Sequence, residues 1–236
     1  MKIDRPGQEE MPAAIDQTSQ LQLADAPAPN AVNKTALHYK EDLNTAEAKA
    51  LAAEIEALKK ELSRKGLKYS NFAGNFKDSD LGEDSQQRKT WEMVWLILHS
   101  KISNPADVLD IGGASTPFSF YLASKGHRVC VIDNDWGDNA LVYNANYVAK
   151  KMNWQLRAIK QDAAGHFSFK DEAFDYIFCV CVMEHLSPQS RRSAMKEMQR
   201  VLKKGGKVAM TFDYSTTRND AHTDKGLRFS DLAALN

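Results

Sequence analysis

Apolar residues recur along this chain with two different spacings, and the change of spacing marks the predicted elements. Continuous apolar runs are typical of strands buried on both faces, whereas apolar residues three or four positions apart are typical of helices. Five short segments rich in apolar residues, the fourth almost wholly apolar, occur in the second half of the chain, at 108–111, 128–132, 155–159, 174–182 and 207–213.

Helical spacing separates most of these runs, over 117–125, 138–152 and 188–202. The first and last of these helices carry start signals, because Ser or Thr stands before Pro at 116–117 and 187–188. Strands that alternate with helices predict an α/β fold with a doubly wound, mainly parallel sheet.

The rest of the chain is organised around residues 106–133, which read as strand, glycine turn, helix and strand. The first strand stops at Gly112 and Gly113, and the second ends at Asp133. Ligands of parallel sheets bind outside the carboxyl ends of the strands, and glycine lets a ligand approach the backbone. An acid at the end of the second strand can accept hydrogen bonds from a ribose. The alternative is an ordinary strand–turn–helix that binds no ligand.

The N-terminal third contains three predicted segments. Residues 1–36 hold few large apolar side chains and are predicted to be a disordered tail. Residues 37–66 are predicted to form a helix with one apolar stripe about two heptads long, so docking on the domain and self-association as a short coiled coil both stay open. Residues 67–89 read as a polar linker before the main domain at 90–236, which opens with a helix over 90–101.

Charge and cysteine usage narrow the classes of function. Lys and Arg together number 31, as do Asp and Glu, so no net charge attracts nucleic acid, and we expect no nucleic-acid partner. No stretch is long and apolar enough for a membrane span. Cys130, Cys179 and Cys181 fall in predicted strands, as buried thiols of a reducing compartment do. These observations predict a cytoplasmic protein with neither a disulfide nor a metal site.

Several strand ends carry distinctive residues, and in this respect the sequence resembles class I S-adenosylmethionine-dependent methyltransferases, specifically the type-11-like methyltransferase domain. The resemblance runs from about residue 91 to residue 231. It is carried by the runs 108–113 (VLDIGG), 131–133 (VID), 174–177 (FDYI), 182–186 (VMEHL) and 200–206 (RVLKKGG). It implies a Rossmann-like methyltransferase fold and S-adenosylmethionine as the cofactor.

The resemblance also implies roles at the ends of the first two strands. Asp110, Gly112 and Gly113 would line the methionine side of the cofactor. Asp133 would hold the two ribose hydroxyls.

Further roles are implied at the ends of the third and fourth strands. Asp162 would accept a hydrogen bond from the adenine amino group, and Ala163 would donate its backbone N–H to the adenine ring. Cys181 and Val182 would lie beneath the sulfonium region.

The chain departs from the family pattern at two places. Ala114 and Thr116 stand where the family's turn usually has further glycines, which predicts a variant cofactor turn. The family's sheet normally ends in an antiparallel hairpin, whereas residues 214–236 are short and polar. The sequence is truncated, or a partner covers the fifth strand, or the fold is a reduced version. An open edge invites association, so we expect a homo-oligomer through this edge or through the N-terminal helix.

The resemblance implies a methyltransferase, and the acceptor is expected to be a small molecule, a lipid or a sugar. Transfer from a sulfonium mainly requires that the nucleophile is held in line with the methyl group. His185 is the candidate base, because an imidazole titrates near neutral pH; the alternative is that it braces its loop. A catalytically degenerate cofactor-binding or interaction module and a nicotinamide-dependent oxidoreductase stay open as other functions, although residues 112–117 make a poor dinucleotide fingerprint.

Overall fold

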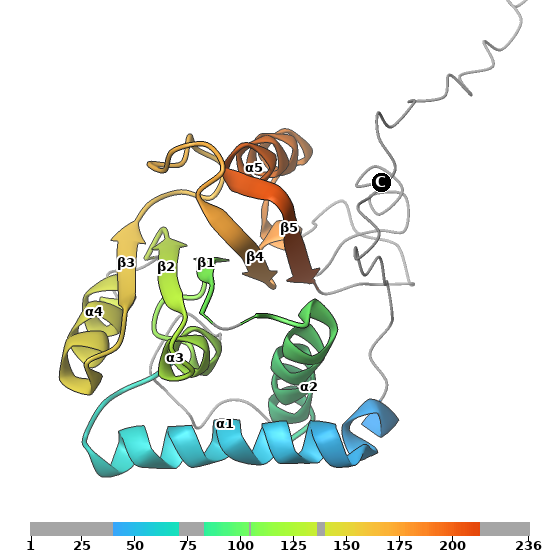
Figure 1. Ribbon diagram of the computed structural model, residues 1–236, viewed down its shortest axis with the longest axis vertical. Coiled ribbons are helices and arrows are strands. Elements are labelled where there is room, and N and C mark those ends of the chain that lie inside the picture. Colours follow the sequence, from blue (N-terminus) through green and yellow to red (C-terminus); the bar gives the residue numbers. More distant parts are fainter. Residues whose placement is uncertain (1–39, 71–82, 104, 136–139, 213–236) are drawn as a thin grey trace, which may run out of the picture. The chain divides into compact units, whose positions relative to one another are not determined.

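A five-stranded parallel sheet forms the centre of the protein. The computed structural model describes residues 40–70, 83–103, 105–135 and 140–212, and Figure 1 shows the arrangement of their helices and strands. The strand order is β3-β2-β1-β4-β5, and every neighbouring pair is parallel. The bounds are β1 Asp107–Ile111, β2 Arg128–Asp133, β3 Leu156–Lys160, β4 Phe174–Val180 and β5 Leu202–Thr211. The predicted α/β fold with a parallel sheet is confirmed, and strand order reverses between β1 and β4.

Two apolar cores cover the two faces of the sheet. One contains residues of α2 (Glu83–Ser100), α3 (Pro117–Ser124) and α4 (Leu141–Met152), and the other contains residues of α5 (Pro188–Val201). Alternate residues of β4 divide between them: Phe178 belongs to the first core, whereas Ile177 and Cys179 belong to the second. The sheet is therefore covered on both faces, which explains why its strands read as continuous apolar runs.

The predicted start signals position the helices that follow β1 and β4. The Thr116 hydroxyl accepts the Ser119 N–H at 3.3 Å at the start of α3, and the Ser187 hydroxyl accepts the Ser190 N–H at 3.1 Å at the start of α5. In both helices proline takes the first position, where no backbone N–H is needed. These caps fix where the chain leaves the carboxyl edge of the sheet.

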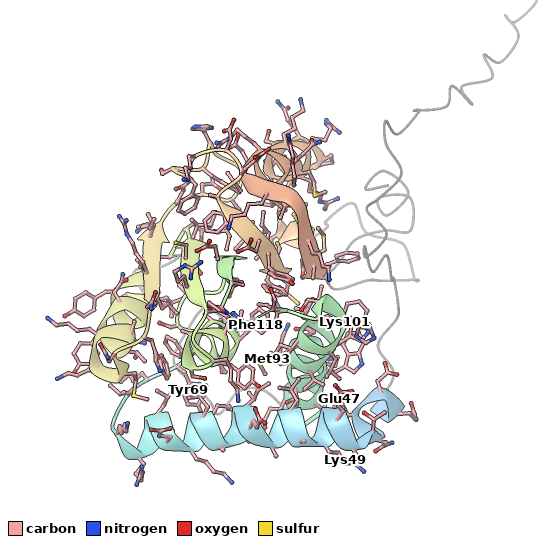
Figure 2. The ribbon with its side chains drawn as sticks, in the orientation of Figure 1. Glu47, Lys49, Tyr69, Met93, Lys101 and Phe118 are labelled. Atoms are coloured by element: carbon pink, nitrogen blue, oxygen red, sulfur yellow. The ribbon has the colours of Figure 1, made fainter. Side chains whose placement is uncertain are left out.

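The N-terminal helix α1 (Ala46–Arg64) docks on the domain. Its buried stripe of Ala48, Leu51, Ile55, Leu58 and Leu62 belongs to the same core as α2 and α3. Glu54 accepts a hydrogen bond from the Tyr121 hydroxyl at 2.8 Å. Figure 2 shows Met93 and Phe118 between α1 and the sheet, and Lys49 on the outer side of α1. Of the two alternatives for this helix, the structure supports docking, because the stripe that a coiled coil would use is buried within the chain.

Two helix boundaries differ from the prediction. The helix expected over 37–66 is divided in the described residues, because a 3-10 turn, η1 (Lys40–Asn44), precedes Thr45, whose side chain caps α1 by accepting the Ala48 N–H. The linker expected over 67–89 is wrong from residue 83 onward, where α2 begins. The first turns of α2 are polar but strongly helix-forming, so the apolar pattern did not mark them.

The fifth strand also differs, because it begins at Leu202 rather than at residue 207 and directly follows α5. Leu202 pairs with Phe174, and Lys207 pairs with Tyr176. β5 therefore advances by five residues where β4 advances by two, and the extra residues of β5 form a bulge. Gly205 allows this with φ of +77°, in the left-handed region that favours glycine. The glycines that predicted a helix end therefore form a bulge within the strand.

Some predicted segments lie outside the described residues: the tail at 1–36, part of the linker, the start of the helix expected at 138, and the segment from 213 to 236. Within the described part, β5 is at one edge of the sheet. No helix there is long and apolar enough to cross a membrane.

Candidate functional site

Backbone contacts tie the carboxyl ends of the strands together at one edge of the sheet. The Gly112 N–H donates to the Ile132 carbonyl at 2.7 Å, which joins the β1 turn to β2. The Gln161 N–H donates to the Asp133 carbonyl at 2.8 Å, which joins the end of β3 to the end of β2. Val182, after β4, lies against Gly112. The structure therefore brings most of the predicted site positions to the edge where ligands of parallel sheets bind.

The turn after β1 requires both of its glycines for reasons internal to the protein. Gly112 has φ of +77°, and a Cβ there would lie 2.3 Å from Val182 Cγ2. A Cβ on Gly113 would lie 1.9 Å from Asp110 Oδ2. Ser115 takes the left-handed conformation, with φ of +64°, at a position where the sequence has no glycine. Its buried hydroxyl donates to the Leu141 carbonyl at 2.6 Å, and this bond holds the variant turn in place.

Asp110 is a fully buried acid whose hydrogen bonding is incomplete. Its Oδ2 accepts a hydrogen bond from the Ser119 hydroxyl at 2.5 Å, while its Oδ1 has no hydrogen-bond partner among the residues that the structure describes. Burial, with a smaller effect of the nearby Asp133 charge, raises the pKa of Asp110 to about 7 although the Ser119 bond opposes the change. A buried acceptor with spare capacity suits a cationic amino group, so this residue fits the methionine end of the cofactor.

Asp133 is half-buried at the end of β2 and is oriented by the backbone. Its two oxygens accept one N–H each, from Ala114 at 3.1 Å and from Asp135 at 2.8 Å. Burial raises the pKa of Asp133 despite these two bonds. A carboxylate has about four acceptor positions, so two remain for a pair of ribose hydroxyls. The acceptor capacity of Asp133 therefore fits the cofactor role that the sequence predicted.

Asp162 and Ala163 lie in a tight turn after β3. The exposed Asp162 accepts the Ala164 N–H at 2.8 Å, and its carbonyl accepts the Gly165 N–H at 3.1 Å. Ala163 is half-buried and packs against the core on the α5 side of the sheet. Within the described residues, the Gln161–Asp133 backbone bond links this turn to the rest of the site, and adenine recognition here stays a prediction.

His185 stands at the outer end of the turn that follows β4. It closes the 3-10 helix η4 (Met183–His185), and its side chain is exposed. The Arg191 guanidinium holds this turn from α5 by donating to the Met183 carbonyl at 2.8 Å. Of the Glu-His pair that the sequence singled out, Glu184 is the buried member, at 2% exposure. The base role of His185 stays a prediction.

A charged cluster that the sequence analysis missed lies beside Cys181. Lys89 and Glu92, one turn apart on α2, form an ion pair of 3.0 Å. The Lys89 ammonium also lies 2.9 Å from Cys181 Sγ, and the thiol donates to Glu92 Oε1 at 3.2 Å. The available signal was an i, i+3 charge pair at the start of the helix predicted over 90–101, but Lys89 fell in the predicted linker.

The comparisons with known proteins agree with the fold. Residues 108–206 match a family described as a methyltransferase domain. A 43-residue stretch is 54% identical to the Encephalitozoon cuniculi (strain GB-M1) protein named "Putative methyltransferase ECU09_1500", and it covers 18% of this chain and 20% of that protein. The chain therefore matches only about a fifth of this curated relative.

Two solved structures are similar in fold. The [4+2]-cyclase SpnF is 18% identical, with a TM-score of 0.54 over 66% of this chain and 58% of its own, and at this identity the likeness shows the fold alone. The PH0226 protein from Pyrococcus horikoshii OT3 is 29% identical, with a TM-score of 0.48 over 58% of this chain and 61% of its own. Residues 108–206, which hold the glycine turn and the strand-end acids of the parallel sheet, are therefore similar to a methyltransferase domain.

Proposed function

We propose that this chain transfers a methyl group from S-adenosylmethionine to a small-molecule, lipid or sugar acceptor. The observation that carries the proposal is a pair of acids at the carboxyl edge of the sheet, beside the point where strand order reverses. Asp110 Oδ1 accepts no hydrogen bond within the described residues, and each Asp133 oxygen accepts a single backbone N–H there. Acids that form no ion pair among the described residues and keep acceptor positions for further donors are suited to a ligand rather than to stability.

The cofactor, when bound, supplies a methyl group on a sulfonium, which is already a good leaving group. The protein then has to bind and orient. Asp133 accepts the ribose hydroxyls, Asp110 and the 112–113 turn hold the methionine end, and Asp162 with Ala163 holds the adenine. Cys181 and Val182 form the floor under the reacting centre. His185, on the exposed end of η4, takes a proton from the acceptor as a base or orients the acceptor.

The acceptor class is inferred from charge. Lys and Arg equal Asp and Glu in number, which disfavours a polyanionic substrate such as nucleic acid. The free thiols of Cys130, Cys179 and Cys181 support a reducing, cytoplasmic location. Because the α1 stripe is buried against the domain, a homo-oligomer would use the β5 edge.

The two competing functions make different predictions. An oxidoreductase would bind a nicotinamide dinucleotide, but the Gly-Gly-Ala-Ser-Thr-Pro turn lacks the glycine spacing of that fingerprint. A degenerate module would bind the cofactor without transferring its methyl group. Measuring which ligand binds distinguishes an oxidoreductase from our proposal. Measuring transfer of a labelled methyl group distinguishes a degenerate module from it.

Calorimetric titration of the full chain with S-adenosylhomocysteine, S-adenosylmethionine and NAD tests the proposal. We expect the first two ligands to bind and NAD to show no heat of binding. Incubation of methyl-labelled S-adenosylmethionine with the protein and a fractionated metabolite and lipid extract should then place label in an extracted product. NAD binding, or the absence of S-adenosylhomocysteine binding, would contradict the proposal.

A further inference from the structure

Lys89, Glu92 and Cys181 form a polar cluster in a place where apolar packing would be expected. Glu92 is 7% exposed, and its ion pair with Lys89 lies on the face of α2 that turns toward the sheet. Removing an ion pair from water costs free energy that packing alone would not require. The Lys89–Glu92–Cys181 cluster therefore needs an explanation beyond the stability of α2.

The position of this cluster points to the reacting end of the site. Cys181 follows the last residue of β4, and the next residue, Val182, lies against the Gly112 turn. Cys181 adopts φ of +53°, a left-handed conformation that is unfavourable for a residue with a side chain. The Cys181 thiol contacts α2, where it donates to Glu92 Oε1 at 3.2 Å. This hydrogen bond places the Glu92 carboxylate beside the carboxyl end of β4.

The charges of the cluster are set by its own members. Burial opposes the positive charge of Lys89, but the charge of the Glu92 carboxylate outweighs this effect and raises the pKa of Lys89. Burial and the nearby Glu92 charge raise the pKa of Cys181, so the thiol stays protonated and donates to the carboxylate. Glu92 Oε1 accepts from Lys89 and Cys181, whereas Oε2 accepts from Lys89 alone in the described structure. Oε2 retains capacity for one more donor.

We infer that Glu92 binds the reacting group of the methyl acceptor, and that this group is protic, an O–H or N–H that donates to Glu92 Oε2. Cys181 is a positioning residue that holds the carboxylate through Oε1, and Lys89 is the counter-ion of the carboxylate. This inference rests on the proposed function and adds to it the chemistry of the acceptor. It also places the acceptor on the α2 side of the fourth strand end.

Sinefungin provides a probe that needs no knowledge of the acceptor. In this analogue of S-adenosylmethionine, a carbon atom bearing an ammonium group replaces the methylsulfonium, so an N–H donor stands in for the transferred methyl. The quantity to measure is the affinity for sinefungin relative to S-adenosylhomocysteine, which lacks that group. A carboxylate facing this position favours sinefungin, whereas a merely structural Glu92 does not.

Calorimetric titration of wild type, Glu92→Gln and Lys89→Gln with both ligands gives a test of sign. Glu92→Gln should weaken sinefungin about tenfold relative to S-adenosylhomocysteine, because a charge-assisted hydrogen bond is lost. Lys89→Gln should strengthen sinefungin about threefold on the same scale, because a like charge is removed. Glu61→Gln, on the outer surface of α1, is the matched control and should change neither affinity.

A ratio that is unchanged in Glu92→Gln, or that moves in the same direction in both variants, overturns the inference. Circular dichroism melting identifies a variant that does not fold. If Glu92→Gln is such a variant, Lys89→Gln decides alone, and a fall or no change in its ratio overturns the inference. Failure of the wild type to bind S-adenosylhomocysteine would instead contradict the proposed function.

Discussion

Acids lie at the amino ends of the strands, called the amino edge below, and at their carboxyl ends, called the carboxyl edge. The hydrogen-bond partners of the acids differ between the two. At the amino edge, Asp107 accepts from Arg128 at 2.6 Å and from Lys203 at 2.8 Å, and Lys203 also contacts Asp175 at 3.0 Å. We call these four residues the amino-edge cluster. At the carboxyl edge, Asp110 and Asp133 form no ion pair with any residue that the structure describes, and their bonds come from a hydroxyl and from backbone N–H groups.

The pKa values follow this difference. The hydrogen bond from Arg128, reinforced by Lys203, lowers the pKa of Asp107 to about 2. Burial raises the pKa of Asp110, three residues later in the same strand, to about 7. A paired acid stabilises the fold when ionised, whereas a buried acid without a counter-ion destabilises it until a ligand completes its bonds.

The largest effect is expected at the turn that covers Asp110. Gly113→Ala would place a Cβ 1.9 Å from Asp110 Oδ2, and relief of this overlap should cost about 2–3 kcal/mol of unfolding free energy. Gly165→Ala is the control, because its Cβ would meet only the Asp162 carbonyl at an ordinary 3.4 Å. Urea denaturation measures both. Equal stability of the two variants would show that the turn yields easily and does not fix Asp110.

A smaller effect, with a definite dependence on pH, is expected for Asp110→Asn. Because the folded pKa is raised from 3.8 to about 7, the wild-type protein loses stability as pH rises through this window. The amide variant lacks this loss, so its stability relative to wild type should rise steadily between pH 4 and pH 8. The exposed Asp162→Asn gives the baseline. A difference that is flat across these pH values would contradict the assignment of Asp110 as a buried acid without a counter-ion.

The smallest effect, of opposite sign, is expected for Asp107→Asn. A lowered pKa contributes stability above 3.8 that is lost as pH falls toward 2. The variant should therefore be less stable than wild type at pH 7, and the difference should vanish near pH 2. The pair is partly exposed and screened by salt, so the loss should be about 1 kcal/mol or less. Thermal melts at pH 2 to 7 measure it; a larger gap at low pH would reverse the contrast.

The sequence was sufficient to predict the elements that its local patterns specify. Continuous apolar runs located the five strands, and the Thr116 and Ser187 caps located two helix starts. These signals are local, because burial on both faces removes alternation and a capping hydroxyl acts within three residues. The β5 boundary failed because Gly205 and Gly206 can end a helix or form a bulge, and only pairing with β4 distinguishes the two outcomes.

The candidate site was predicted less completely, for a different reason. Asp110 was found because it lies just before the turn that follows β1, and Asp133 because it ends β2. Both positions follow from the order of residues along the chain. The Lys89–Glu92–Cys181 cluster was missed because α2 reaches the fourth strand end only through tertiary packing, across about 90 residues of sequence. Likewise, the exposure of His185 and the burial of Glu184 depend on how α5 holds η4, which spacing does not reveal.

The central claim is that the carboxyl edge binds a ligand and the amino edge does not. Calorimetric titration with S-adenosylhomocysteine of Asp133→Asn and Asp107→Asn, one acid from each edge, tests it most directly. We predict that Asp133→Asn weakens binding at least about tenfold, because charge-assisted hydrogen bonds to the ribose are lost, while Asp107→Asn retains wild-type affinity. Wild-type affinity in a folded Asp133→Asn variant, or equal weakening in both, would contradict the account.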